Sequence, residues 1–391
     1  MLTRIDIENY KSIDKLSVEL GRFNVIIGEN GAGKSNILEA IGLAAARMAN
    51  KLDNEFLASR GIRVTRPELM RANFKKGNKE KDLLLRLHFG NEFYNLLLSN
   101  DNQSYSKWYE KGSENVQFAK DSHPLNIMLS NILEIHQIEV FKAFNDPQNA
   151  KVSHRDLVEE VKKTIIKLAF TSKNISDFLL YSPNEKEIRT CEDDTQFEPL
   201  VIHFEGLFKL LRVMSQNEKA EFKTLKEHLK LLGWFSDFNI EPSEFSEERK
   251  LAIKDKFLKG DLKYFDQKSS NEGFLFLLFY LALFLSKETP KFFAVENIET
   301  SLNPKLCTKL IKLLNDISKE KEKQVILTTH NPAILDGLDL NDDEQRLFVV
   351  HRNTKGHTKI TRIERKEGAA AKVKLSEAFM NGYLGGLPEN F

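Results

Sequence analysis

The sequence predicts an α/β protein with a mixed, largely parallel sheet and an inserted, mainly helical lobe. Three observations lead to this prediction. A glycine-rich loop lies between an apolar strand and a helix near the start of the chain. Two further short apolar strands alternate with helices in the last third, which is typical of a parallel sheet. Between these parts the pattern changes to helical periodicity with many charged residues.

The first part of the chain contains two alternating strands, followed by the apolar strand 23–27. This strand runs into glycines and then into a helix that starts at Lys34. Residues 82–98 are rich in apolar and aromatic side chains around Gly90, which predicts a β-hairpin beside the first sheet. We therefore expect residues 1–121 to form the first piece of a discontinuous domain.

The middle of the chain, residues 122–259, is predicted to form the inserted lobe. Helical periodicity is clearest over 156–170, 204–213 and 218–232. These helices are too short and too often interrupted for long paired coiled-coil arms, which need a sustained heptad repeat. We therefore expect a compact helical lobe.

The last part, residues 260–391, is predicted to complete the discontinuous domain. An apolar helix over 274–285 precedes a buried strand over 291–296. A helix over 304–317 and a second buried strand over 324–329 follow. The alternation of helix and strand predicts that these strands lie parallel in one sheet.

Composition indicates an ordinary globular protein without disulfides. The 391 residues are 41% hydrophobic, and 58 Lys and Arg nearly balance 57 Asp and Glu. The net charge thus gives no bias toward nucleic acid, and any such contact would need a local patch. Cys191 and Cys307 are isolated, which excludes a metal-spaced pair. Residues 1–10 lack a signal-peptide pattern and 274–285 are too few to span a bilayer, so we expect a cytoplasmic protein without a membrane role.

The glycine-rich loop matches the phosphate-binding pattern G-x-x-x-x-G-K-S over residues 28–35. Its glycines let backbone amides converge on phosphates at a helix N-terminus. Lys34 would neutralise the β- and γ-phosphates of ATP, and the Ser35 hydroxyl would ligate Mg²⁺. The predicted ATP-binding residues here are Asn30, Gly31, Ala32, Gly33, Lys34, Ser35 and Asn36.

The ends of the two later strands carry groups that such a site needs. Glu296 would hold Mg²⁺, and the acid after it would normally orient the attacking water. That position is Asn297, which can orient a water but cannot accept its proton. Either ATP is turned over slowly and acts mainly as a dimerising ligand, or Glu299 supplies the carboxylate. His330 follows the last strand and can reach a γ-phosphate, although a solvated strand-end histidine is the alternative.

Residues on both sides of the phosphate loop resemble a known family. Residues 8–12 (Glu-Asn-Tyr-Lys-Ser) before the loop and 36–40 (Asn-Ile-Leu-Glu-Ala) after it are similar to the N-terminus of RecF, SMC and OLD-type ATPases. This resemblance implies an ABC-type ATPase head. Where the family usually has Asp-Glu, this chain has Glu296-Asn297, which lengthens the metal-side carboxylate and replaces the water-side one by an amide.

Three later segments resemble the family's remaining motifs. Residues 269–274 are similar to the signature loop that contacts the partner's ATP in a dimer, and Ser270 and Gly273 are the implied contacts. Residues 302–304 resemble the D-loop, and 329–332 the switch-histidine segment. The resemblance implies a homodimer, or a higher homo-oligomer, that closes around ATP.

The resemblance also implies a function. Compact heads of this kind are similar to regulatory ATPase subunits of bacterial antiphage systems such as Septu, in which a separate effector, for instance a nuclease, is controlled. One alternative is a RecF-like DNA-repair ATPase that binds DNA across its dimer. Another is a scaffold that binds ATP without turnover.

Two weaker signals concern nucleic acid. A basic cluster has few acids nearby and would suit phosphate contacts, although a charge run is more often a solvated face. The cluster consists of Arg60, Arg63, Arg66, Arg71, Lys75 and Lys76. Glu364 and Lys366 spell half of a nuclease motif, but no suitably placed aspartate precedes them, so we interpret them as a solvated strand end. Arg189 is a further candidate for contact with the head.

Overall fold

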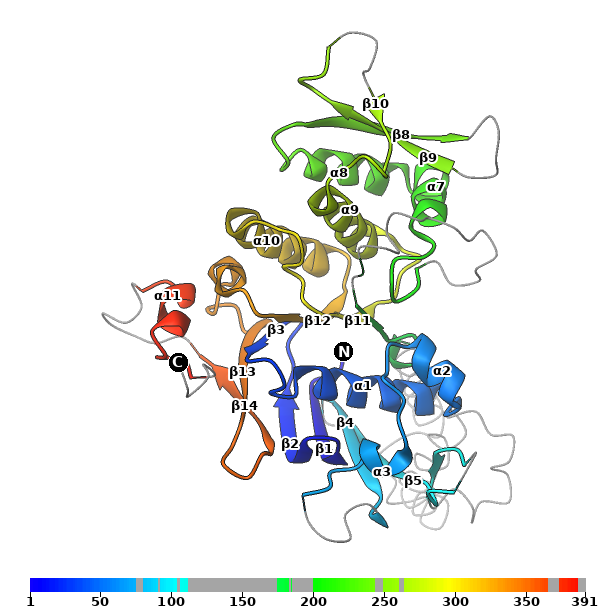
Figure 1. Ribbon diagram of the computed structural model, residues 1–391, viewed down its shortest axis with the longest axis vertical. Helices are drawn as coiled ribbons and strands as arrows, with labels where there is room; N and C mark the ends of the chain where they lie inside the picture. The colour runs from blue at the N-terminus through cyan, green and yellow to red at the C-terminus, as the bar shows by residue number, and fades with distance from the viewer. Residues whose placement is uncertain are drawn as a thin grey trace, which may run out of the picture.

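The computed structural model describes residues 1–74, 80–90, 92–103, 106–111, 174–182, 184, 200–242, 249–259, 264–364 and 373–385. Within these residues the chain forms three sheets with helices packed between and around them (Figure 1). The predicted helix over 156–170, together with Arg189, Cys191 and Lys366, lies outside the described residues.

The central sheet has six strands in the order β14-β13-β3-β12-β11-β7. All neighbours are parallel except β14, which is antiparallel to β13. The strands are β3 (Phe23–Gly28), β7 (Leu179–Tyr181), β11 (Phe292–Val295), β12 (Gln324–Thr329), β13 (Gln345–Arg352) and β14 (Thr358–Ile363). The predicted α/β class with a mixed sheet is confirmed, and the two strands predicted in the last third lie side by side in it.

The second sheet is antiparallel, with the order β2-β1-β4-β5-β6. Its strands are β1 (Arg4–Tyr10), β2 (Ile13–Glu19), β4 (Leu83–Phe89), β5 (Glu92–Ser99) and β6 (Tyr109–Glu110). β4 and β5 form the hairpin predicted around Gly90, whose φ is 67°. Glycine adopts this left-handed conformation without the penalty that a Cβ would bring.

Helix α1 (Lys34–Met48) lies between the two sheets, and α9 (Glu272–Leu285) and α10 (Pro304–Glu320) cover the opposite face of the central sheet (Figure 1). Successive residues of β3 point to opposite faces. Val25 and Ile27 accordingly belong to the core with α9 and α10, whereas Ile26 belongs to the core with α1. The central sheet is buried on both faces, which explains its continuous apolar strands.

The most apolar helix of the chain is α9, where every residue from Phe274 to Leu285 is at most 1% exposed. A helix that is hydrophobic on all sides must be buried on all sides. The buried Lys323 lies at its C-terminal end and donates to the carbonyl oxygens of Leu283 (2.7 Å) and Ser286 (2.8 Å). This buried amino group satisfies acceptors at the helix end.

The inserted lobe differs in part from the helical prediction. Helices α7 (Leu207–Asn217) and α8 (Lys219–Leu229) are present, and α8 packs on α9. However, β8 (Phe235–Pro242) and β9 (Arg249–Asp255) form a third sheet with β10 (Tyr264–Phe265), which we did not predict. In addition, β7 comes from within the predicted insertion and pairs with β11. The exact limits of the two domains stay a prediction.

The remaining described helices are short. They are α2 (Asn54–Ser59), α3 (Pro67–Met70), the 3-10 helix η3 (Pro332–Gly337) and α11 (Leu375–Met380). Helix α11 packs on η3, at the opposite end of the central sheet from α2 (Figure 1). The described residues contain no helix with both the length and the apolar character needed to cross a bilayer.

Candidate functional site

The predicted phosphate loop connects β3 to α1 at one edge of the central sheet. Gly31 and Gly33 have φ angles of 76° and 107°, a region that glycine adopts without strain. Gly33 is also the N-cap of α1, and no side chain caps the helix there. The first backbone N–H groups of α1 are thus not satisfied by a side chain, and such a helix end favours an anion. Asn30 is exposed in this loop, and Ser35 is half-buried in the first turn of α1.

The hairpin of β13 and β14 supports the phosphate loop from behind. A Cβ on Gly28 would lie 2.1 Å from the backbone oxygen of Val350, and a Cβ on Gly33 would lie 2.1 Å from Oγ1 of Thr358. The Thr358 hydroxyl donates to the Ala32 carbonyl at 2.8 Å. These glycines are therefore required by the packing of the loop as well as by any phosphate that it holds.

Lys34 is 7% exposed, and its ammonium donates to the carbonyl oxygens of Gly28 (2.9 Å) and Glu29 (3.0 Å). Burial lowers the pKa of Lys34 to about 8, although the carboxylates of Glu299, Glu296 and Glu29 favour its charged form. A phosphate brought next to the ammonium would favour the charged form further. Two of the predicted acids, Glu296 and Glu299, thus act on the charge of this lysine, while its role toward a phosphate stays a prediction.

Glu296 and Asn297 directly follow β11. Asn297 is exposed and has φ 50°, in the left-handed region that asparagine adopts more easily than most residues. Its backbone N–H donates to Oγ1 of Thr328 at 3.1 Å, and its carbonyl accepts from the Thr300 hydroxyl at 2.7 Å. The asparagine therefore fits a tight turn. This backbone role is one explanation for Asn297 at the position where the resembled family usually has Glu, beside the chemical explanation of slow turnover.

Glu299 and His330 meet at this turn. One carboxylate oxygen of Glu299 accepts from the backbone N–H of His330 at 2.7 Å. Its other oxygen, Oε2, is buried and has no hydrogen-bond partner among the residues that the structure describes. Burial and the charge of Lys34 lower the pKa of His330, against the opposing effect of Glu299 and Glu296. At neutral pH the imidazole is therefore uncharged and offers one donor and one acceptor nitrogen.

Lys34, Glu296, Glu299 and His330 thus form one electrostatic group. They follow β3, β11 and β12, which are parallel neighbours in the central sheet. The carboxyl ends of parallel strands meet at the same edge, where open α/β sheets bind their ligands. The sheet therefore brings together residues that the sequence separates by almost 300 positions.

Arg63 is a further member of this site, and we did not predict that role. Its guanidinium donates to the buried Glu39 and, at 3.3 Å, to the Asn36 side chain in the first turn of α1. Although burial lowers the pKa of Arg63, the hydrogen bond and charge of Glu39 and the charge of Glu296 raise it above its usual value. Nothing in the sequence shows that this loop folds back onto α1.

Two other members of the predicted basic cluster are structural, which corrects the idea that it forms one phosphate-contacting face. Arg71 is 1% exposed; it stacks on Trp108 and donates to the carbonyl oxygens of Lys81 and Asn100. Arg60 is 8% exposed over an aromatic ring of α2. Lys75 and Lys76 lie outside the described residues. Buried arginines of this kind cannot contact a nucleic acid.

The segment that resembles the signature loop leads into α9. Asn271 is the N-cap of this helix, and a Cβ on Gly273 would lie 2.9 Å from the backbone oxygen of Ser301. The Ser301 hydroxyl donates to Glu272 at 2.6 Å. The start of α9 is thus held against the segment that contains Glu299. Ser270, the implied contact to a partner's ATP, is only 4% exposed in the single chain.

The other two family motifs both coincide with helix starts. Asn303 is the N-cap of α10, accepting from the backbone N–H of Leu306 at 2.9 Å, and Pro304 follows at N1. Asn331 caps η3 by accepting from the N–H of Ala333 at 3.0 Å. Asparagine and proline are preferred at these positions in any helix. These motif residues therefore have a structural role whatever their function.

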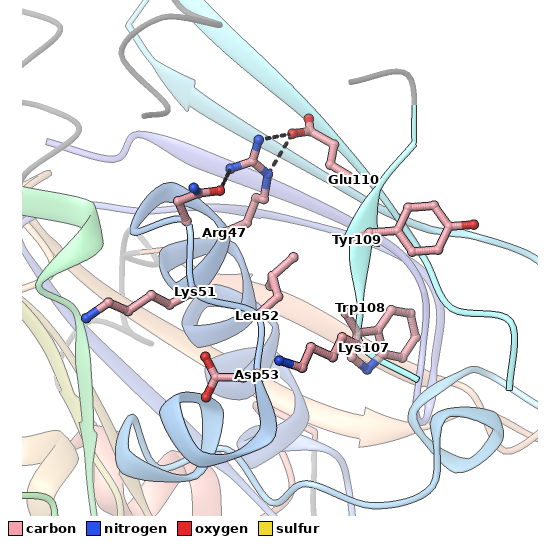
Figure 2. Close-up of a pocket in the computed structure, with 9 residues that line it drawn as sticks. Arg47, Lys51, Leu52, Asp53, Lys107, Trp108, Tyr109 and Glu110 are labelled. Carbon is pink, nitrogen blue, oxygen red and sulfur yellow. Dashed lines mark hydrogen bonds and ion pairs between the residues drawn. The ribbon is translucent and has the colours of Figure 1, made fainter. Parts of the chain in front are cut away.

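A cavity of about 300 Å³ lies at the other end of α1, away from the phosphate loop (Figure 2). Arg47 on its wall forms an ion pair with Glu110 at 2.6 Å and donates to the Asn50 side chain at 3.3 Å. Asp53 caps α2 by accepting from the N–H of Phe56. Each of these polar groups thus already has a partner, and the dashed lines in Figure 2 show those of Arg47. We interpret this cavity as part of the scaffold.

The donor set fits a magnesium ion that is held mainly by phosphates and water. Among the described residues, no group of three or more His, Cys, Asp or Glu is placed to bind a metal. Mg²⁺ at phosphate sites needs only one or two protein oxygens. Ser35 in the first turn of α1 and Glu296 after β11 offer these. Glu364, from the weak nuclease pattern, directly follows β14 and is exposed.

The family model described as "AAA domain, putative AbiEii toxin, Type IV TA system" matches residues 23–336. The uncharacterized protein MJECL10 of Methanocaldococcus jannaschii is 34% identical over 112 residues, which are 27% of this chain and 50% of that protein. The DNA double-strand break repair Rad50 ATPase of Sulfurisphaera tokodaii is 52% identical over 48 residues, which are 12% of this chain and 6% of that protein. The matches thus span half or less of these relatives.

A solved structure has the same fold. The SMC head bound to the C-terminal winged-helix domain of ScpA superimposes with a TM-score of 0.54 at 16% identity. The alignment covers 93% of this chain and 97% of that one. At this identity the likeness shows the fold alone. It confirms the predicted class, an ABC-type head with a mixed sheet.

Proposed function

Because this chain belongs to the family described as AAA domain, putative AbiEii toxin, Type IV TA system, we propose that it is a regulatory ATPase that closes as a dimer around ATP. The electrostatic group of Lys34, Glu296, Glu299 and His330 behind the phosphate loop carries this proposal. A loop that binds phosphate without turnover would not need two carboxylates and a neutral histidine beside its lysine.

Each residue has a distinct role in this proposal. The amides of the phosphate loop and Lys34 bind the β- and γ-phosphates. Ser35 and Glu296 would hold Mg²⁺, which supplies positive charge to the phosphates when bound. The neutral His330 contacts the γ-phosphate as a hydrogen-bond donor. Arg63 adds a fixed positive charge near Glu296.

Glu299 is the residue that we assign to the attacking water. Its Oε1 is held by the His330 backbone, which fixes the carboxylate, while the buried Oε2 has an unused acceptor. Asn297 is exposed and occupies a turn, and its amide cannot take a proton. Of the two readings that the sequence left open, these observations favour a carboxylate supplied by Glu299.

We further propose that head closure controls a separate effector protein, with a nuclease as the expected class, in bacterial defence. The description of the matched family as a toxin of a toxin–antitoxin system supports a chain that acts together with a second protein. A repair ATPase that binds DNA is the weaker alternative, because Arg60 and Arg71 of the basic cluster are buried.

Steady-state phosphate release at saturating ATP and Mg²⁺ tests the assignment of Glu299. Glu299→Gln keeps the size of the side chain but removes its charge, so turnover should fall by about 10²–10⁴ while ATP binding survives. Asn297→Glu should change turnover by less than about threefold, because this residue is exposed and its backbone forms a left-handed turn. Asn297→Gly, which keeps the left-handed φ, is the matched control for the backbone.

Two results would contradict this assignment. If Glu299→Gln left turnover unchanged and Asn297→Glu raised it, the protein would instead be an ATP-holding scaffold. If all variants stayed within about threefold of the wild type, neither residue would act on the attacking water, and the placement of the metal carboxylate on Glu296 would also be wrong.

A further inference from the structure

Four polar side chains behind the phosphate loop form a continuous hydrogen-bond chain that ends on one of the loop's carbonyls. The Arg63 guanidinium donates to Oδ1 of Asn36 at 3.3 Å. Nδ2 of Asn36 lies 2.6 Å from Oγ of Ser12, which lies 2.6 Å from Oγ1 of Thr358. The Thr358 hydroxyl donates to the Ala32 carbonyl at 2.8 Å. The chain thus joins the turn after β1, the start of α1 and β14 to the phosphate loop.

The donors and acceptors of this chain have only one consistent order. An arginine has no acceptor, so Asn36 accepts through its carbonyl oxygen and donates through its amide nitrogen. A hydroxyl has a single proton. Because Thr358 uses its proton on the Ala32 carbonyl, Ser12 must donate to Thr358 and accept from Asn36. Every member therefore donates toward the phosphate loop, an arrangement in which hydrogen bonds strengthen one another.

The end of the chain fixes the peptide plane between Ala32 and Gly33. The described residues contain no cis peptide bond, and in a trans peptide the carbonyl and the following N–H point in opposite directions. The Ala32 carbonyl faces Thr358, so the Gly33 N–H faces away from the hairpin of β13 and β14. Gly33 is buried, yet its N–H has no hydrogen-bond partner among the described residues. Such an N–H is rare in a folded chain, and in a phosphate loop it is available to a phosphate oxygen.

The packing around Gly33 shows how closely the two hydroxyls hold this peptide. A Cβ at this residue would lie 2.1 Å from Oγ1 of Thr358 and 2.8 Å from Oγ of Ser12. The backbone supports the same arrangement, because the Thr358 N–H donates to the Ser12 carbonyl at 2.8 Å. Thr358 is 0% exposed and Ser12 is 5% exposed. Bulk water therefore has little access to these hydroxyls and would not readily replace one that is removed.

We propose that Thr358 and Ser12 are positioning residues for ATP: through the Ala32 carbonyl, they hold the Gly33 N–H in the direction of the phosphate before the nucleotide binds. The inference rests on the proposed function, in which the phosphate loop binds ATP. An amide that is already oriented needs no reorganisation when the phosphate arrives, which favours affinity. Both hydroxyl residues lie outside the range 23–336 that the family model matches, so this role belongs to parts of the chain that the model does not describe.

Calorimetric titration of the full chain with ATP and Mg²⁺ tests this role. Thr358→Val keeps nearly the same shape and removes the hydroxyl. We expect ATP affinity to fall about tenfold, because a buried carbonyl loses its donor and the peptide is no longer fixed. Thr358→Ser restores the hydroxyl without the methyl group and should bind ATP within about twofold of the wild type. Thr361→Val, at an exposed threonine of the same strand, is the matched control.

A second variant tests the order of the chain. Ser12→Ala leaves the bond from Thr358 to the Ala32 carbonyl in place and removes only the donor behind it. We therefore expect a smaller loss of ATP affinity than in Thr358→Val, about threefold or less.

Three outcomes would overturn this inference. Thr358→Val would bind ATP as tightly as Thr361→Val, which would show that the hydroxyl does not matter. Thr358→Ser would lose as much affinity as Thr358→Val, which would assign the effect to packing of the methyl group. Ser12→Ala would lose as much affinity as Thr358→Val, which would contradict the order of donors.

Thermal unfolding without nucleotide separates this inference from the proposed function. If the wild type did not bind ATP, the proposed function would fail, and a double-mutant cycle of Thr358→Val and Ser12→Ala would decide whether the hydrogen-bond chain exists. The two hydroxyl oxygens are 2.6 Å apart, so the double variant should lower the unfolding midpoint by less than the sum of the two single variants. Additive shifts would refute the chain.

Discussion

At the scale of single residues, we expect Lys34 to decide whether nucleotide binds. Replacing it by Ala removes the charge that faces the phosphates, and Lys34→Met does the same while nearly preserving the buried volume. We expect both variants to lose ATP affinity by about 10²-fold or more, because charge-assisted bonds to phosphate are among the strongest polar contacts. Calorimetry with ATP and Mg²⁺ measures this directly. The exposed Lys51, replaced by Ala, is the matched control, and undiminished binding in the first two variants would refute the phosphate-loop assignment.

The sequence predicts single residues well where chemistry fixes their spacing. The spacing of glycines before Lys34 places a phosphate loop because few other structures need that pattern. Arg63 has no such signature, and its place near Glu296 follows only from a loop that folds onto α1. The burial of Arg71 under Trp108 is likewise a tertiary contact that charge patterning cannot reveal.

At the scale of elements, the buried amino group of Lys323 at the end of α9 makes stability depend on pH. Burial and the nearby Lys291 lower the pKa of Lys323 well below its usual value, while Glu218 acts in the opposite direction. The unfolded chain therefore binds more protons than the folded one between the lowered pKa and about 10.5. In this window the contribution of Lys323 to the free energy of unfolding rises with pH, and above it the contribution is constant.

Lys323→Met should remove this dependence. We expect the free energy of unfolding of the wild type, relative to the variant, to increase from pH 7.5 to pH 9.5 by at most about 1.4 kcal/mol per pH unit. Urea unfolding at the two pH values measures it. Lys287→Met, at an exposed lysine near the same helix end, should leave the dependence unchanged. If the free energies of unfolding of wild type and Lys323→Met changed in parallel with pH, the pKa of Lys323 would be the same in the folded and the unfolded chain, and the prediction would be wrong.

Elements that are buried on both faces were the easiest to predict. β11, β12 and α9 are continuous apolar runs, and their lengths alone distinguish strand from helix. β8 was missed because its register against β9 shifts between Phe235 and Asp237, which breaks the alternation that reveals a strand. β7 has only three residues and is recognisable as a strand only through its pairing with β11.

At the scale of the whole molecule, we expect two heads to close around ATP through the segment that leads into α9. The buried Ser270 is a poor place to test this, because a large side chain there would disturb the loop itself. The neighbouring Ser269 is exposed. Ser269→Arg should weaken ATP-dependent dimerisation by tenfold or more, while the affinity of the monomer for ATP changes less than about twofold.

Light scattering with ATP and Mg²⁺, in the Glu299→Gln background so that nucleotide persists, measures this assembly. Ser17→Arg introduces the same side chain at an exposed serine of β2, on the antiparallel sheet, and should assemble normally. If the two arginine variants assembled equally well, the segment before α9 would not lie in the dimer interface.

The hairpin behind the phosphate loop has a consequence for synthesis on the ribosome. The Thr358 hydroxyl meets the Ala32 carbonyl across 326 positions of sequence, and the Ser12 hydroxyl across 346. At translation rates of about 5–20 residues per second, the loop emerges on the order of 20–60 s before the strands that complete its support. During that interval the nascent N-terminal sheet exists without a finished nucleotide pocket, so ATP can stabilise this protein only after most of the chain has been translated.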